Sequence, residues 1–130
     1  MTSTNTTVGA TIKSMAAFGY HGNVLDIDLT SGTSISSAID DDVLRRYIGG
    51  SGLGVHLLLE RHAYDHDPFD PASTIGFVFS PLVGSPLTTS AKFAVVNRSP
   101  LTMRFNDSLA SSRFAINGKR TGHDAIMITG

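Results

Sequence analysis

The chain contains no cysteine and no tryptophan among its 130 residues. Without cysteine it forms no disulfide, and it cannot hold an iron–sulfur cluster through thiolate ligands of its own. A thiol-free chain fits the reducing cytoplasm, and we expect a cytoplasmic location.

Neither sign of charge is in excess, and no long apolar run occurs. The net charge is −1 and the pI is about 6.5, whereas a nucleic-acid-binding domain usually carries a basic excess. No apolar run approaches the roughly 20 residues that span a membrane, and we identify no signal peptide. We therefore expect neither nucleic acid nor membrane as a partner.

What is present suits a single domain. Apolar residues make up 41% of the chain, enough for a hydrophobic core. The first residues are rich in Ser and Thr and lack a hydrophobic period, so we expect 1–18 to be a flexible arm. The domain is then expected to cover 19–130.

The clearest strand pattern lies in the segment NVLDIDL. Leu25, Ile27 and Leu29 alternate with Asp26 and Asp28, which predicts a half-buried strand with the apolar side chains inward. A turn, TSGT, and a second strand follow.

The remaining elements alternate between helices and strands without a regular βαβ repeat. A short helix is capped by Asp40 and ends before Gly49, and a second helix follows it. We predict later elements as strands 74–80, 92–97 and 124–130 and a helix over 106–122 that starts at Asn106 or Asp107. The expected fold is α+β, with a mixed β-sheet and a few short helices.

Four glycines interrupt the segment RRYIGGSGLGVHLLLE. A dinucleotide-binding loop needs G-x-G-x-x-G directly after a strand, but here a helix precedes the glycines and Val55 occupies the third position. The Gly-Lys-Ser/Thr ending of a P-loop is also missing. The stretch therefore favours a tight corner between two helices, where glycine lets backbones approach closely.

Other clusters of polar residues match no known metal loop. The five histidines lack zinc-site spacing, and the acidic segment DHDPFDPAS lacks the glycine and glutamate of an EF-hand. Basic residues gather late in the chain, and we predict that most form a solvated face while a subset lines an anionic cofactor or a subunit interface: Arg98, Arg104, Arg113, Lys119 and Arg120.

Five segments in order resemble the N-terminal domain of the aldehyde ferredoxin oxidoreductase family. They are YHGNVLDIDLTSG, LRRYIGGSGLGVHLLLE, DPFDPAS, FSPLVGSPLTTSAKFAVVNRSPLT and GKRTGHDAIMITG. Members of this family are tungsten or molybdenum enzymes with a bis-pterin cofactor and an iron–sulfur cluster. The resemblance implies a β-sheet domain that forms the base on which the pterins lie.

The resemblance also implies a set of cofactor-binding residues. Lys92 stands where the family typically has an arginine at the pterin phosphate, and it keeps the charge but loses the bidentate fork. Ser90 and Ala91 replace two glycines in the same segment.

A second cofactor-facing segment, often Asn-Ser-Gly-Gly in the family, is matched by Leu109, Ala110, Ser111 and Ser112. We expect Ser108, Ser111 and Ser112 at or near a helix N-terminus, where hydroxyl and amide donors favour an anion.

Two functions follow from the resemblance, both without catalytic or metal-ligating residues in this chain. The first is a pterin-cradling subunit or fragment of a tungsten or molybdenum enzyme that oxidises aldehydes to carboxylic acids and passes electrons to a ferredoxin-like acceptor. A larger partner chain would then supply the cluster and the substrate site. The second is a non-catalytic module for pterin binding, delivery or self-assembly, in which the partner is another copy.

Overall fold

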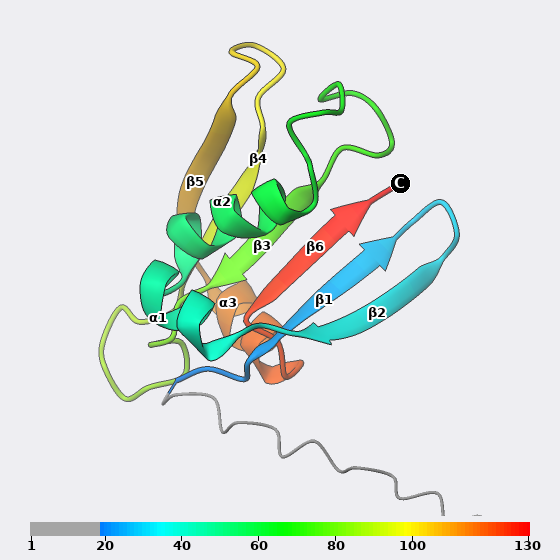
Figure 1. The fold of residues 1–130 in the computed structure, drawn as a ribbon. Helices are drawn as coiled ribbons and strands as arrows, with labels where there is room; N and C mark the ends of the chain where they lie inside the picture. The colour runs from blue at the N-terminus through cyan, green and yellow to red at the C-terminus, as the bar shows by residue number, and fades with distance from the viewer. Residues whose placement is uncertain (1–18) are drawn as a thin grey trace, which may run out of the picture.

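A mixed six-stranded sheet organises residues 19–130, the part of the chain described by this computed structural model (Figure 1). The expected arm at 1–18 lies outside the described residues. Strands follow the order β2-β1-β6-β3-β4-β5, and β1 and β6 are parallel while the other neighbours are antiparallel. The α+β prediction with a mixed sheet is confirmed. The strands are β1 Asn23–Asp28, β2 Thr33–Ala38, β3 Ile75–Phe79, β4 Lys92–Arg98, β5 Phe105–Ser111 and β6 Ala125–Thr129.

The alternating segment forms β1, but the inward side differs from the prediction. Val24 is the fully buried side chain of this strand, while Leu25 and Ile27 are only half-buried on the opposite face. Leu29 lies beyond the strand and is 64% exposed. Asp26 points to the helical side, where Arg61 donates two hydrogen bonds to its carboxylate at 2.7 and 2.8 Å.

Two helices, α1 (Asp41–Tyr47) and α2 (Gly50–Glu60), follow the first hairpin. Asp40 caps α1 through a hydrogen bond from the backbone of Asp42, as the sequence predicts. The corner between the helices is only two residues long, because α2 begins at Gly50 and runs through the remaining glycines.

Helix α2 covers one face of the sheet at very short range. Leu53, Leu57 and Leu58 are buried there against β3, β4 and β6. A Cβ atom added to Gly54 would lie 2.8 Å from the methyl carbons of Val96, so only glycine allows this approach.

The predicted helix over 106–122 is wrong in its first half. Residues 105–111 form β5, an edge strand paired antiparallel with β4. The helix, α3 (Arg113–Arg120), begins only at its cap, Ser112, whose hydroxyl accepts a hydrogen bond from the backbone of Phe114. Pairing with β4 therefore overrides the turn and cap preferences of the Asn, Asp and Ser residues in this segment.

Helix α3 lies on the face of the sheet opposite α2 (Figure 1) and covers one end of that face. Its Phe114 ring contacts Phe77, Phe79 and Phe93 at centroid distances of 5.5, 6.1 and 5.1 Å. Within residues 19–130, the rest of that face carries no second layer of similar size.

A buried ion pair joins α3 to the start of β6. Asp124 is 0% exposed and accepts hydrogen bonds from Lys119 and from the backbone N–H groups of His21 and Gly22. Lys119 is itself 7% exposed, so the predicted solvated basic face does not include it.

No helix within the described residues is long and apolar enough to cross a membrane.

Candidate functional site

Lys92 and Ser111 lie side by side at one end of the sheet. They face each other across the β4–β5 pair, and the Lys92 ammonium donates a hydrogen bond of 3.0 Å to the Ser111 hydroxyl. Among residues 19–130, no carboxylate lies within ion-pair distance of Lys92. The positive charge is thus left uncompensated at an exposed edge.

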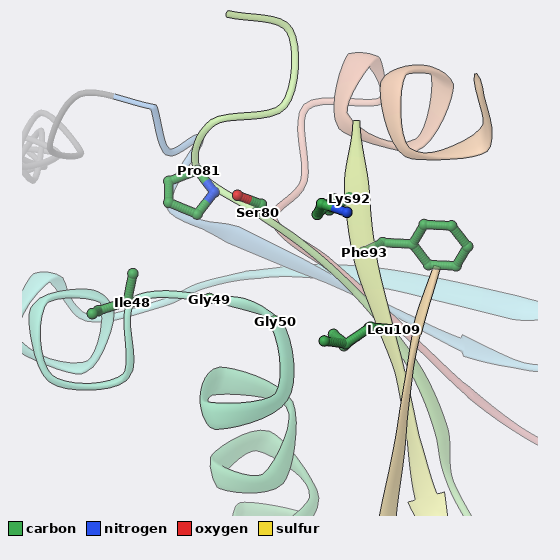
Figure 2. A pocket seen from close by; sticks show the side chains of 9 residues that line it. Ile48, Gly49, Gly50, Ser80, Pro81, Lys92, Phe93 and Leu109 are labelled. Carbon is green, nitrogen blue, oxygen red and sulfur yellow. The ribbon is translucent and has the colours of Figure 1, made fainter. Parts of the chain in front are cut away.

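A pocket of about 220 Å³ opens beside this cation (Figure 2). The α1–α2 corner forms one side and strands β4 and β5 form the other. Most of the wall is apolar, and the lining residues are Ile48, Gly49, Gly50, Ser80, Pro81, Lys92, Phe93, Ala94 and Leu109. A flat, largely apolar group with an anionic end matches this combination of walls and charge.

A second pocket, of about 240 Å³, shares Ser80 and Lys92 with the first. Its other walls are hydroxyl-bearing or aliphatic residues of the β3–β4 loop: Leu82, Leu87, Thr88, Thr89 and Ser90. Lys92 therefore stands between an apolar pocket and a hydroxyl-rich one.

The start of α2 adds amide donors to the first pocket. The first N–H groups of a helix have no intrahelical acceptor, and here, with Gly49 at the cap position, no side chain caps them. The helix dipole places partial positive charge at the same point. Together with Lys92, this end of the sheet favours a negative group.

Ile48 holds the corner in a rare backbone conformation. Its φ and ψ are 63° and −55°, and the Gly49 N–H bonds to the Tyr47 carbonyl at 2.7 Å, which makes a γ-turn of the strained kind. The Tyr20 hydroxyl donates a hydrogen bond to the Ile48 carbonyl and so braces the corner from outside.

This brace gives a prediction for alkaline stability. The pKa of Tyr20 is raised above its ordinary value, first by burial and second by the negative charge of Asp124. The folded state holds the phenolic proton more tightly, so this stabilisation is intact below about pH 10 and is lost as pH rises through the raised pKa. In urea unfolding between about pH 8 and about pH 11, the free energy of unfolding should fall less steeply above about pH 10 in Tyr20→Phe than in wild type. Parallel curves across the whole range would contradict this account.

The other residues implied by the resemblance are distributed over both faces. Ser90 lines the second pocket, and Leu109, which is 72% exposed, lines the first. Ala91 packs against the aromatic cluster under α3, and its carbonyl accepts from the Ser112 backbone at 3.2 Å. Ser112 caps α3, so its hydroxyl already has a partner.

Sequence reasoning did not identify several wall residues. Ile48, Ser80 and Pro81 line the first pocket because the α1–α2 corner lies across the end of β3 and β4. Phe93 borders it from β4, but its ring points away from the pocket (Figure 2) and packs under α3. The tight corner predicted from the glycines is the available signal, since a Cβ atom at Gly49 would lie 3.0 Å from Cδ of Pro81, and its absence lets the corner approach the end of β3.

Residues 19–130 contain no group of three or more His, Cys, Asp or Glu side chains placed to hold a metal ion.

The family model described as "Aldehyde ferredoxin oxidoreductase, N-terminal domain" matches residues 24–130. The chain is 32% identical over 113 residues to the tungsten-containing aldehyde ferredoxin oxidoreductase of Pyrococcus abyssi, covering 87% of this chain. It is 29% identical over 116 residues to the WOR-like subunit of an aliphatic sulfonate oxidoreductase of Pyrococcus furiosus, covering 87% of this chain and 18% of that one.

A solved structure has the same fold. One chain of the active site complex BamBC of benzoyl coenzyme A reductase, in complex with 1,5-dienoyl-CoA, superposes with a TM-score of 0.81 at 30% identity. The match covers 87% of this chain and 17% of that one. The present chain likewise spans 19% of the P. abyssi enzyme, so these proteins contain much polypeptide that has no counterpart here.

Proposed function

Because the chain belongs to the family of the aldehyde ferredoxin oxidoreductase N-terminal domain, we propose that it cradles the bis-pterin cofactor of a tungsten or molybdenum oxidoreductase. The observation that carries the proposal is the uncompensated ammonium of Lys92, bonded to Ser111 between two pockets. The family match alone would leave open whether the chemistry of the site is retained.

The residues present fit the two ends of such a cofactor. Lys92 and Ser111 offer a cation and a hydroxyl to a phosphate, and the first turn of α2 offers amide N–H groups to the same charge. Ile48, Pro81 and Leu109 provide apolar surface for a flat ring. When bound, the metal–pterin group would supply the oxidation of an aldehyde to a carboxylic acid, and the protein would orient it and limit access of water.

The chain needs a partner for the complete reaction. These 130 residues contain no cysteine, so a cluster that passes electrons to a ferredoxin-like acceptor would be held by polypeptide outside them. A larger subunit with the cluster and the substrate pocket completes the proposal, and the thiol-free composition favours an assembly in the cytoplasm.

The test is cofactor retention in the assembly isolated from the organism that encodes the chain. Wild type should contain tungsten or molybdenum together with pterin. In Lys92→Ala, the rate of cofactor loss during dialysis should rise by about 10–100-fold, because a hydrogen bond to a charged group contributes about 1.5–3 kcal/mol. Elemental analysis and pterin fluorescence measure the loss.

Two control variants locate the effect. Lys92→Arg should retain most of the cofactor because the charge remains. Arg104→Ala removes an exposed cation beside another pocket and should behave as wild type. The proposal would be overturned if the wild-type assembly contained neither tungsten nor molybdenum. It would also be overturned if Lys92→Ala retained the cofactor as well as wild type does. Metal found without a cysteine-rich subunit would indicate a non-catalytic cofactor carrier instead.

A further inference from the structure

The sheet face opposite α2 carries two uncharged apolar rows. In the first, Leu25, Ile126, Phe77 and Val95 are neighbours across β1, β6, β3 and β4. In the second, Ile27, Ile128 and Ile75 are neighbours across β1, β6 and β3. Neighbouring residues of a register point to the same face, so each row is one continuous stripe.

Serines flank the first row at both edges of the sheet and the second row at the β2 edge. Ser36 and Ser34 continue the rows on β2, and Ser108 ends the first row on β5. No Asp, Glu, Lys or Arg interrupts either row. The charged residues of β1, Asp26 and Asp28, point to the other side.

Only part of this face is covered by residues 19–130. Helix α3 and the β3–β4 loop pack on Phe79 and Phe93, and three residues of the first row also pack against this cluster: Phe77, Val95 and Ile126. The second row lies outside that cluster, and Ile75 is 38% exposed. An apolar sheet face of this kind resembles the inner face of a two-layer structure from which the second layer is missing.

We propose that an apolar polypeptide layer of the larger oxidoreductase subunit packs on this face, along the row Ile27–Ile128–Ile75. The inference rests on the proposed function and names the surface through which its partner binds. The matched relatives carry about four-fifths of their length beyond the part aligned here, which provides such a layer. A second copy of this chain is a poorer occupant, because it also lacks the cysteines that the assembly requires.

The absence of cysteine allows a direct test by single-cysteine labelling. Ile75→Cys puts one thiol on the proposed interface, and Ile35→Cys puts a matched thiol on β2, where the side chain is 66% exposed on the opposite face. Maleimide labelling rates are compared between the isolated chain and the native assembly. Assembly should slow labelling at least about tenfold in Ile75→Cys and less than about twofold in Ile35→Cys, because the core of an interface excludes water.

A benzophenone attached to the same thiols identifies the occupant. Photocrosslinks from position 75 should reach a cysteine-rich oxidoreductase subunit, as read by mass spectrometry. Crosslinks that reach only a second copy or lipid would overturn the inference. So would a thiol at position 75 that assembly does not protect from maleimide, or equal protection of the thiols at positions 75 and 35. Circular dichroism of both variants confirms that they fold.

Combining Lys92→Ala with Ile75→Cys separates this inference from the proposed function. The double variant should lose cofactor while the introduced thiol stays protected from maleimide. In the single variant Ile75→Cys, an unprotected thiol in an assembly that retains its cofactor would reject the interface and leave the proposed function standing. If the thiol at position 75 is protected from maleimide but the wild-type assembly contains no metal, the proposed cofactor-binding function is rejected and the interface stands.

Discussion

Asp124→Ala should destabilise the protein by about 3–5 kcal/mol, the range measured when one partner of a buried ion pair is removed. Asp124 is fully buried, and its carboxylate accepts from Lys119 and from the backbone of His21 and Gly22. The variant leaves a buried ammonium without a counter-charge and two backbone donors without an acceptor. The free energy of unfolding in guanidinium chloride measures the loss.

A paired substitution tests whether the charge itself is responsible. In Lys119→Met/Asp124→Asn, the asparagine oxygen still accepts from Gly22 and the methionine fills the space of the lysine stem. Replacing both charges should recover most of the stability, leaving a loss of about 1–2 kcal/mol. A cost of less than about 1 kcal/mol for Asp124→Ala would show that water or a rearranged backbone replaces the pair.

The effect of Asp124→Ala should extend to the candidate site. The carboxylate fixes the backbone just after Tyr20, and the Tyr20 hydroxyl braces the corner at Ile48. Loss of the anchor therefore loosens one wall of the first pocket, and cofactor retention should fall together with stability.

Gly118→Ala should cost about 2 kcal/mol, although alanine is the better helix former. A Cβ atom at position 118 in α3 would lie 2.6 Å from the Cε1 atom of Phe79 and closer still to its Cζ atom. The Phe79 side chain is 1% exposed and has little space to move. The ring is held within the aromatic cluster of Phe114, so overpacking of about 3 kcal/mol outweighs the helical gain of about 0.5–1 kcal/mol. Thermal and chemical unfolding both report the change.

Asn117→Ala is the matched control, since Asn117 is exposed on the same helix. Its stability should stay within about 0.5 kcal/mol of wild type. An unchanged stability in Gly118→Ala would mean that the Phe79 ring moves aside without loss of packing.

The sequence predicts most elements of the fold because their local signals agree with their packing. The caps of α1 and the apolar strands β3, β4 and β6 are examples in which propensity and burial point the same way. For β1 the period was right, but alternation cannot tell which face a helix will cover, and Val24 rather than Leu25 is fully buried.

The segment 105–111 shows why part of the candidate site escaped prediction. Its polar residues favour caps and turns, whereas the strand is imposed by pairing with β4. That same pairing sets Lys92 opposite Ser111, so the closest contact of the site depends on a register that the local sequence does not encode. Whether the pair binds a cofactor stays a prediction until retention is measured.

Lys119 shows a different limit. Five basic residues late in the chain suggest a solvated face, yet one of them is buried against a carboxylate five positions later. Composition cannot distinguish these cases, because burial of Lys119 depends on the close approach of α3 to Phe79 at Gly118.

The order of strands has a consequence for synthesis. The β1–β2 hairpin, made first, joins the rest of the sheet only through β6, and its parallel partner residues are about a hundred positions away, as Val24 and Ala125 show. A nascent chain on the ribosome therefore exposes the unpaired side of β1 until residues 125–129 emerge. Chaperone binding during that interval should centre on the hairpin, because its docking requires the most distant contact of the sheet.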